Sequence, residues 1–339
     1  MSRAFLALTL ALAAATVAAP RSGTLDWPYS PGTASYAIGN NFGPYQHYQG
    51  YDPYYHNGID ILAGSPGRPV YAIASGIVMR VVTNDDFNSG IVIGTPGDGS
   101  PGYAYWHLHR DSIKFAVNQS VTAGDKIGEV VDWDIPDAFD HIHLCKVEGV
   151  GKGKVWTTHE IAGDPLADLH PIPDTTKPVI EPLDGTRPFR FSDDATGQYL
   201  AGSALKGSVD VIARIGDKVD GHPWKLAPHR VSWTVTPAQA GAPLRVPLLL
   251  DGALGAPNDV LATLYRNDAT VRSAGDYETR EFSFVLTHAH QNRPVVIGHR
   301  NGAWNTGSVP NGVYTVRVVA ADRAGNEGVA TQTVTINNR

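Results

Sequence analysis

Short apolar runs, each closed by a turn, place the strongest constraint on how this chain can fold. Between residues 69 and 147 such runs cover residues 70–74, 77–82, 91–93, 103–106 and 127–131. Runs of this length suit strands better than helices. The 36 glycines and 24 prolines supply the turns that many short elements need. We therefore predict an all-β protein in which this region forms a compact antiparallel β-sheet domain.

The chain has 339 residues, which is longer than one average domain and favours two. Prolines gather around residues 163–178 and indicate a linker, which we place at residues 171–178. The first domain then spans residues 24–170. Beyond the linker, alternating runs predict a C-terminal β-sandwich over residues 179–339. The stretch at about 237–299 is long for a sandwich connection, and we interpret it as an insertion with one strand at residues 280–286.

The N-terminus has the pattern of a secretory signal peptide. Arg3 precedes an apolar stretch at residues 5–17, and the small residues Ala18 and Ala19 follow. We predict a signal peptide over residues 1–19 and an exported protein, periplasmic or extracellular. No other segment is apolar enough to cross a membrane, so no membrane span is expected after signal removal. The net charge of -6 argues against nucleic acid as a partner.

Cys145 is the only cysteine, so the chain can form no internal disulfide. In an alternating strand it would lie on the same side as His141 and His143. A role as a metal ligand is therefore conceivable on parity alone. We interpret Cys145 instead as a buried structural thiol, because other ligands suffice.

Widely spaced histidines and one aspartate carry the chemistry of the first domain. They are His56, Asp60, His107, His141 and His143. Two imidazoles and one carboxylate can hold a zinc ion and leave a fourth position for water. Further imidazoles can then move protons beside that water. His141 and His143 should share one strand face, while a loop delivers His56 and a strand start delivers Asp60.

Each of these motifs is weak alone, since His288-Ala289-His290 also fits His-x-His. Their combination and order, however, resemble the lysostaphin-like (LytM-type) zinc metallopeptidases of family M23. The resemblance covers about residues 41–169. It includes the segments at residues 69–78 and 121–128 and the Asp164-Pro165-Leu166 end.

The resemblance implies a role for each residue of the set. His56, Asp60 and His143 would be the ligands of one Zn²⁺ per chain. His107 and His141 would be the catalytic pair that does not bind metal, one taking the proton of water and the other stabilising the oxyanion. The resemblance leaves open which does which, and it places His109 outside the site.

The function implied is that of an exported zinc metalloendopeptidase, which hydrolyses peptide bonds in peptidoglycan cross-links. Two alternatives remain: a non-catalytic wall-binding or activator protein of the same fold, and a secreted protease of Gly-rich proteins. The C-terminal domain resembles bacterial Ig-like or fibronectin-like modules at residues 174–180, 311–316 and 322–326. Such a module could bind wall polymer or a protein partner, or act as a spacer. The cleaved bond, the oligomeric state and a latent form made by the segment before His56 stay open.

Overall fold

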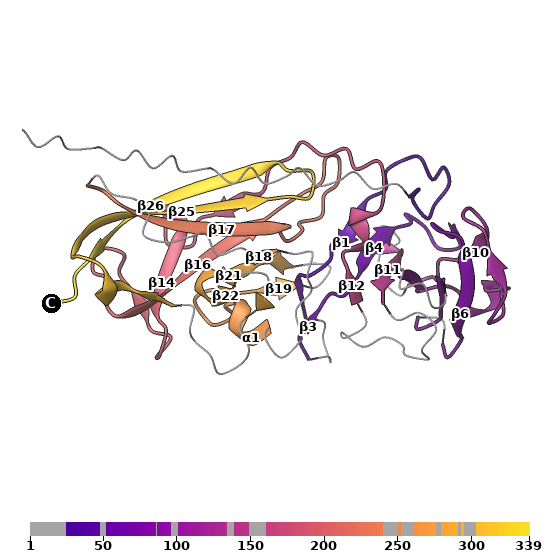
Figure 1. Ribbon diagram of the computed structural model, residues 1–339, viewed down its shortest axis with the longest axis horizontal. Helices are drawn as coiled ribbons and strands as arrows, with labels where there is room; N and C mark the ends of the chain where they lie inside the picture. Colours follow the sequence, from indigo (N-terminus) through magenta and orange to yellow (C-terminus); the bar gives the residue numbers. More distant parts are fainter. Residues whose placement is uncertain are drawn as a thin grey trace, which may run out of the picture.

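The chain folds into two β-rich parts that are joined by one connecting segment (Figure 1). The computed structural model describes residues 25–47, 52–85, 87–95, 101–133, 139–148, 161–239, 250–251, 261–275, 279–290, 293–294 and 303–339. The predicted signal peptide lies outside these residues. Strands dominate the described residues, and the one α-helix among them is the short α1 (Leu261–Leu264). The all-β fold class is therefore confirmed.

The N-terminal part is built on one antiparallel sheet of eight strands. Its order is β1 (Ile38–Asn40), β4 (Ile59–Leu62), β11 (His141–Val147), β8 (Gly102–Trp106), β7 (Gly90–Gly94), β6 (Gly76–Val82) and β9 (Ser120–Val121). The eighth strand, β12 (Ile161–Gly163), also pairs with β11. Two separate two-stranded sheets accompany it, β5 (Pro69–Tyr71) with β10 (Lys126–Glu129) and β2 (Tyr45–Gln46) with β3 (Tyr54–Tyr55).

Burial of alternating side chains explains why β11 sits at the centre of this sheet. Ile142 and Leu144 are completely buried and pack in the same hydrophobic core as Ile59 and Ile61 of the neighbouring β4. The intervening positions project to the opposite face, because successive side chains of a strand alternate. Ile142 thus faces the core, and His141 and His143 face the other way.

The C-terminal part consists of two antiparallel sheets. One has the order β13 (Val179–Glu181), β16 (Ser208–Gly216), β14 (Phe189–Asp193) and β15 (Tyr199–Leu200), with β21 (Ser283–Val285) and β24 (Trp304–Asn305) also paired to β16. The other has the order β18 (Leu250–Asp251), β17 (Arg230–Pro237), β25 (Gly312–Ala321) and β26 (Glu327–Ile336). The backbone N–H of Phe189 donates to Gln332 Oε1 at 2.9 Å and links the two sheets.

The segment at residues 237–299 contributes to this architecture where it is described. The strand expected at residues 280–286 is divided into β20 (Arg280–Glu281) and β21. β21 belongs to the sheet of β16, while β20 pairs with β19 (Ala274–Gly275). A further pair joins β22 (Ala289–His290) to β23 (Arg293–Pro294). In the described part of the chain, no helix combines the length and apolar character needed to cross a membrane.

Candidate metal centre

Strand register brings Asp60 and His143 together on one face of the large sheet. His143 in β11 is paired with Asp60 of β4 on one side and with Trp106 of β8 on the other. Directly opposed residues of antiparallel strands project to the same face. His56 comes from the loop between β3 and β4, and Asp60 is the second residue of β4. This is the loop-and-strand arrangement that the sequence predicted.

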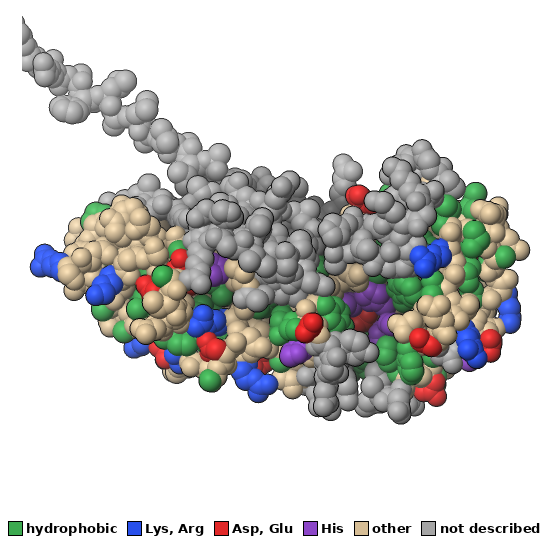
Figure 2. All heavy atoms as spheres, turned by 90° about the horizontal axis from the view of Figure 1, so that it is seen from below, with side chains coloured by type: hydrophobic (Ala, Val, Ile, Leu, Met, Phe, Trp, Pro, Cys, Tyr) green, Lys and Arg blue, Asp and Glu red, His purple; other side chains and the backbone are tan. Residues whose placement is uncertain are grey.

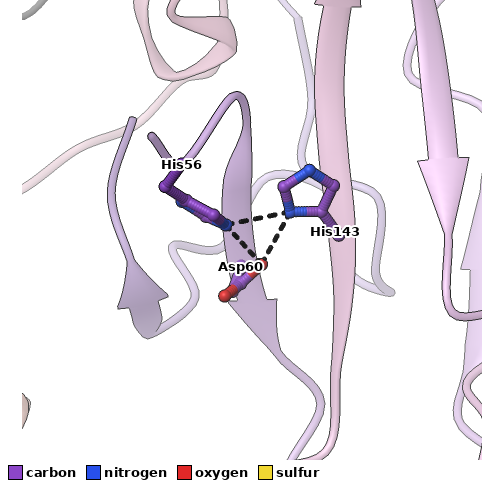
Figure 3. A group of neighbouring side chains, drawn as sticks. All are labelled: His56, Asp60 and His143. Carbon is purple, nitrogen blue, oxygen red and sulfur yellow. Dashed lines mark hydrogen bonds and ion pairs between the residues drawn. The ribbon is translucent and has the colours of Figure 1, made fainter. Parts of the chain in front are cut away.

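The three predicted ligands converge on one point (Figure 3). His56 Nε2 lies 3.1 Å from Asp60 Oδ1 and 3.0 Å from His143 Nδ1. His143 Nδ1 lies 2.9 Å from Asp60 Oδ1. Ligands that bind a tetrahedral zinc at its usual bond lengths are about 3.3 Å apart, so this spacing fits the ion closely.

The protonation of the two rings also fits a cation. His56 Nδ1 donates to the carbonyl oxygen of Asn41 at 2.8 Å, which leaves a lone pair on Nε2. His143 Nε2 donates to Asn57 Oδ1 at 3.0 Å, which leaves a lone pair on Nδ1. Two lone pairs and the Asp60 carboxylate oxygen therefore face one another. A metal ion bound by all three would replace their mutual repulsion with coordination bonds.

Asp60 is held as a carboxylate in a buried setting. Burial alone would raise its pKa, but the neighbouring His56 and His141 outweigh burial and hold the pKa well below its usual range. Its other oxygen, Oδ2, accepts a hydrogen bond from Asn40 Nδ2 at 2.5 Å. The ligand oxygen is thus charged and its direction is fixed from β1.

Close backbone packing beside the ligands leaves no room for a side chain at Gly58. A Cβ there would lie 2.5 Å from the carbonyl oxygen of Leu144 and 2.8 Å from the His143 ring. Glycine is therefore required for the loop carrying His56 to approach β11.

His107 and His141 lie beside the three ligands. Their ring centroids are 5.0 Å apart, and His141 Nε2 is 3.7 Å from Asp60 Oδ1. Trp133 stacks on His141 with an interplanar angle of 13° and meets His107 edge-on, with ring centroids 4.5 Å apart. All five sequence-predicted residues are thus brought into one site.

Hydrogen bonds to the backbone orient both of these imidazoles. His107 Nδ1 donates to the carbonyl oxygen of Phe87 at 2.6 Å, and His141 Nδ1 donates to that of Phe139 at 2.7 Å. In each ring the other nitrogen, Nε2, remains for proton transfer. Burial, followed by the charges of His141 and His143, lowers the pKa of His107 well below the ordinary histidine value. A neutral His107 is a competent proton acceptor at neutral pH.

Cys145 and His109, which the sequence predicted to lie outside the metal centre, have different surroundings. Cys145 is buried, and burial raises its pKa far above that of a free thiol, which disfavours the thiolate. Its sulfur is 3.1 Å from His143 Nε2, the nitrogen that faces away from the other ligands. His109 is exposed and lines a separate surface pocket with Ser112 and Glu129.

Sequence reasoning missed the residues that support the site. They are Asn40, Asn41, Asn57, Phe87, Trp133 and Phe139. Four of them, Asn41, Asn57, Phe87 and Phe139, act through a backbone or amide oxygen, which a side-chain motif does not reveal. Figure 2 shows histidine side chains gathered in a hollow of the surface, with hydrophobic side chains beside them.

The antiparallel sheet and this arrangement of donors have the features of an all-β metallopeptidase domain. Residues 54–147 match the model of peptidase family M23, a segment that contains all five predicted site residues. The match confirms the family resemblance over this segment of the chain.

Several solved structures are similar to part of this chain. LytU is 28% identical, with 35% of this chain and 78% of that chain covered and a TM-score of 0.28. A zinc-containing peptidase from Vibrio cholerae is 23% identical, with 40% and 41% covered and a TM-score of 0.29. A variant of the catalytic domain of EnpA, a prophage-encoded M23 protein from Enterococcus faecalis, is 21% identical, with 40% and 98% covered and a TM-score of 0.28. No curated protein matches the chain.

Proposed function

We propose that this protein is an exported zinc metalloendopeptidase that hydrolyses peptide bonds in peptidoglycan cross-links. The observation that carries the proposal is the convergence of His56, Asp60 and His143, with ligand atoms 2.9–3.1 Å apart, beside two further oriented imidazoles. The match of residues 54–147 to a peptidase family supports the reaction class. The signal-like N-terminus supports export.

The roles within the site follow from the donors available. His56, Asp60 and His143 would hold the zinc ion. When bound there, zinc would supply Lewis-acid polarisation of the scissile carbonyl and would make water more acidic. His141 lies beside Asp60 and His107 lies beside His143, so substrate and water would meet next to these two imidazoles.

We assign proton abstraction to His107. Its Nδ1–H is committed to the Phe87 carbonyl, and its lowered pKa keeps Nε2 free to accept a proton from water. His141, whose Nδ1–H is committed to the Phe139 carbonyl, would stabilise the oxyanion of the tetrahedral intermediate as an imidazolium, donating from Nε2–H. Trp133 packs against both rings and holds them at a fixed separation.

Zinc content and peptidoglycan digestion test the proposal together. Elemental analysis of the purified chain should give one zinc, and a His143→Ala variant should lose it. Mass spectrometry of purified peptidoglycan after digestion should reveal new peptide termini. His107→Ala should retain zinc but lose activity by orders of magnitude, on the order of 10²-fold or more.

Two outcomes would decide against the proposal. A zinc-loaded protein that releases no peptide from peptidoglycan, casein or elastin would support the non-catalytic alternative. Cleavage of elastin with no action on peptidoglycan would support the alternative of a protease for Gly-rich proteins.

A further inference from the structure

A second group of potential ligands lies in the C-terminal part, away from the histidines. Asp174 belongs to the connecting segment, Asp217 directly follows β16, and Asp322 directly follows β25. Each offers one carboxylate oxygen, and the three oxygens lie within 4.8 Å of one another. Two oxygens bound to the same Ca²⁺ are at most about 5 Å apart, given its usual bond lengths. The spacing therefore suits a shared calcium ion.

Burial makes this cluster unlike an ordinary acidic surface. Asp217 and Asp322 are only 6% and 5% exposed. Asp217 Oδ1 is fully buried and has no hydrogen-bond partner among the described residues. A buried carboxylate oxygen without a partner is costly. A bound cation would offset that cost.

The electrostatics of the three carboxyl groups agree with this geometry. Burial, followed by the charge of Asp322, raises the pKa of Asp217 to about 8. Burial raises the pKa of Asp174 to about 6 and also raises that of Asp322. The fold thus brings three acidic groups together against their repulsion.

Hydrogen bonds orient two of the three carboxylates. Asn326 donates to Asp322 through its backbone N–H at 2.8 Å and its side-chain Nδ2 at 2.7 Å. The same Nδ2 donates to the carbonyl oxygen of Asp174 at 3.0 Å. Asp174 Oδ1 accepts from the backbone N–H of Thr176 at 3.1 Å. These neutral donors fix the side chains but add no positive charge to the cluster.

We propose that Asp174, Asp217 and Asp322 form a Ca²⁺ site that fastens the connecting segment to both sheets of the C-terminal part. β16 and β25 belong to different sheets, so one ion would tie three separate segments together. An all-oxygen, carboxylate-rich donor set favours Ca²⁺ over zinc, and Mg²⁺ rarely occupies such protein-built cages. Arg323, next to Asp322, pairs with Asp164 of the N-terminal part, so the site would also stiffen the junction.

The test uses the full chain with zinc bound and other divalent ions removed. Titration of CaCl₂ in a calorimeter should give one site per chain, and Ca²⁺ should raise the midpoint of thermal unfolding. Asp217→Asn should lower the Ca²⁺ affinity at least about tenfold, since affinity follows ligand charge. Without Ca²⁺, and above about pH 8 where the Asp217 carboxyl group is ionised, this variant should unfold at a higher temperature than the wild type, because the repulsion is relieved.

Controls separate this site from other effects. Asp322→Asn is a second variant that should also lose the response, whereas Asp184→Asn, on an exposed turn, should keep it. His143→Ala should keep the Ca²⁺ response even though its zinc is lost. The proposal is wrong if neither heat nor a midpoint shift is seen up to about 10 mM CaCl₂, a range that covers weak extracellular sites. It is equally wrong if Asp217→Asn responds as the wild type does, or if only MgCl₂ produces an effect.

Discussion

His107 shows how a single residue is prepared for proton transfer. Its backbone φ is 64°, in the left-handed region that costs a non-glycine residue about 1–2 kcal/mol. The Phe87 carbonyl and the Trp133 ring hold its imidazole in place. Strained backbone of this kind persists only where surrounding contacts determine it, and it clusters at functional sites. At the end of β8, the strained backbone of His107 thus lowers local stability, while its imidazole ring keeps a fixed direction.

The lowered pKa of His107 predicts the pH dependence of activity. The neutral ring is the form that accepts a proton, and it predominates above the pKa. Because that pKa lies below the ordinary histidine value of about 6.5, kcat/KM should stay level through the neutral range. Activity should fall only as the pH drops well below that value. Initial rates of peptide release across a pH series, with zinc content measured at each pH, would check this.

His107→Gln serves as the control, since its residual rate should lack this acidic limb. An acidic limb centred above the ordinary histidine value in the zinc-loaded wild type would contradict the assignment of His107 as the base.

At the scale of elements, one row of residues across four strands builds the site. Asn40 of β1 is paired with Asp60 of β4, Asp60 with His143 of β11, and His143 with Trp106 of β8. His107 directly follows Trp106. Since each pair is fixed by strand register, a shift of one residue in β11 would turn His141 and His143 into the core.

The β1 end of this row leads to a prediction about zinc affinity. Asn40→Ala removes the donor to Asp60 Oδ2 while leaving all three ligands in place. Loss of a hydrogen bond that orients a metal ligand weakens metal affinity by about 10–100-fold. Competition with a chromophoric chelator would measure the zinc dissociation constant. Asn337→Ala, at an exposed asparagine near the C-terminus, should bind zinc as the wild type does. Unchanged affinity in Asn40→Ala would show that β1 does not support the site.

Strand periodicity explains which part of the site was predictable from the sequence. The alternation His141-Ile142-His143 fixed the faces of β11. Because Ile142 is buried in the core, both imidazoles must project to the opposite face of the strand. Asn57, Phe87 and Trp133 lie on loops, whose approach to the sheet depends on tertiary packing rather than on any local pattern. Their contacts use carbonyl and amide oxygens or ring faces, and the sequence does not mark these. The break between β20 and β21 was missed because β20 pairs with the nearby β19 whereas β21 joins the distant β16, and no local pattern marks this change of partner.

At the scale of the whole molecule, the C-terminal part packs on the outer layer of the site. Asn41 accepts the hydrogen bond of His56 through its carbonyl, while its side chain donates to the Ala227 carbonyl at 2.6 Å. Arg280 donates to the Gly39 carbonyl, next to Asn40. The C-terminal strand β19 packs against β2 of the N-terminal part, where the two parts meet in Figure 1. The C-terminal part therefore contacts residues that support the candidate metal centre.

Trp224 offers a test of whether this packing supports catalysis. Its ring meets Phe139 edge-on, with centroids 5.0 Å apart, and the Phe139 carbonyl orients His141. Trp224→Ala should let Phe139 shift, and a displaced catalytic group loses rate steeply. We expect kcat to fall about tenfold with little change in KM or zinc content. Trp224→Phe, which keeps an aromatic edge against Phe139, should restore most of the rate. A lower unfolding midpoint with kcat unchanged would mean that the interface stabilises the fold and does not position His141.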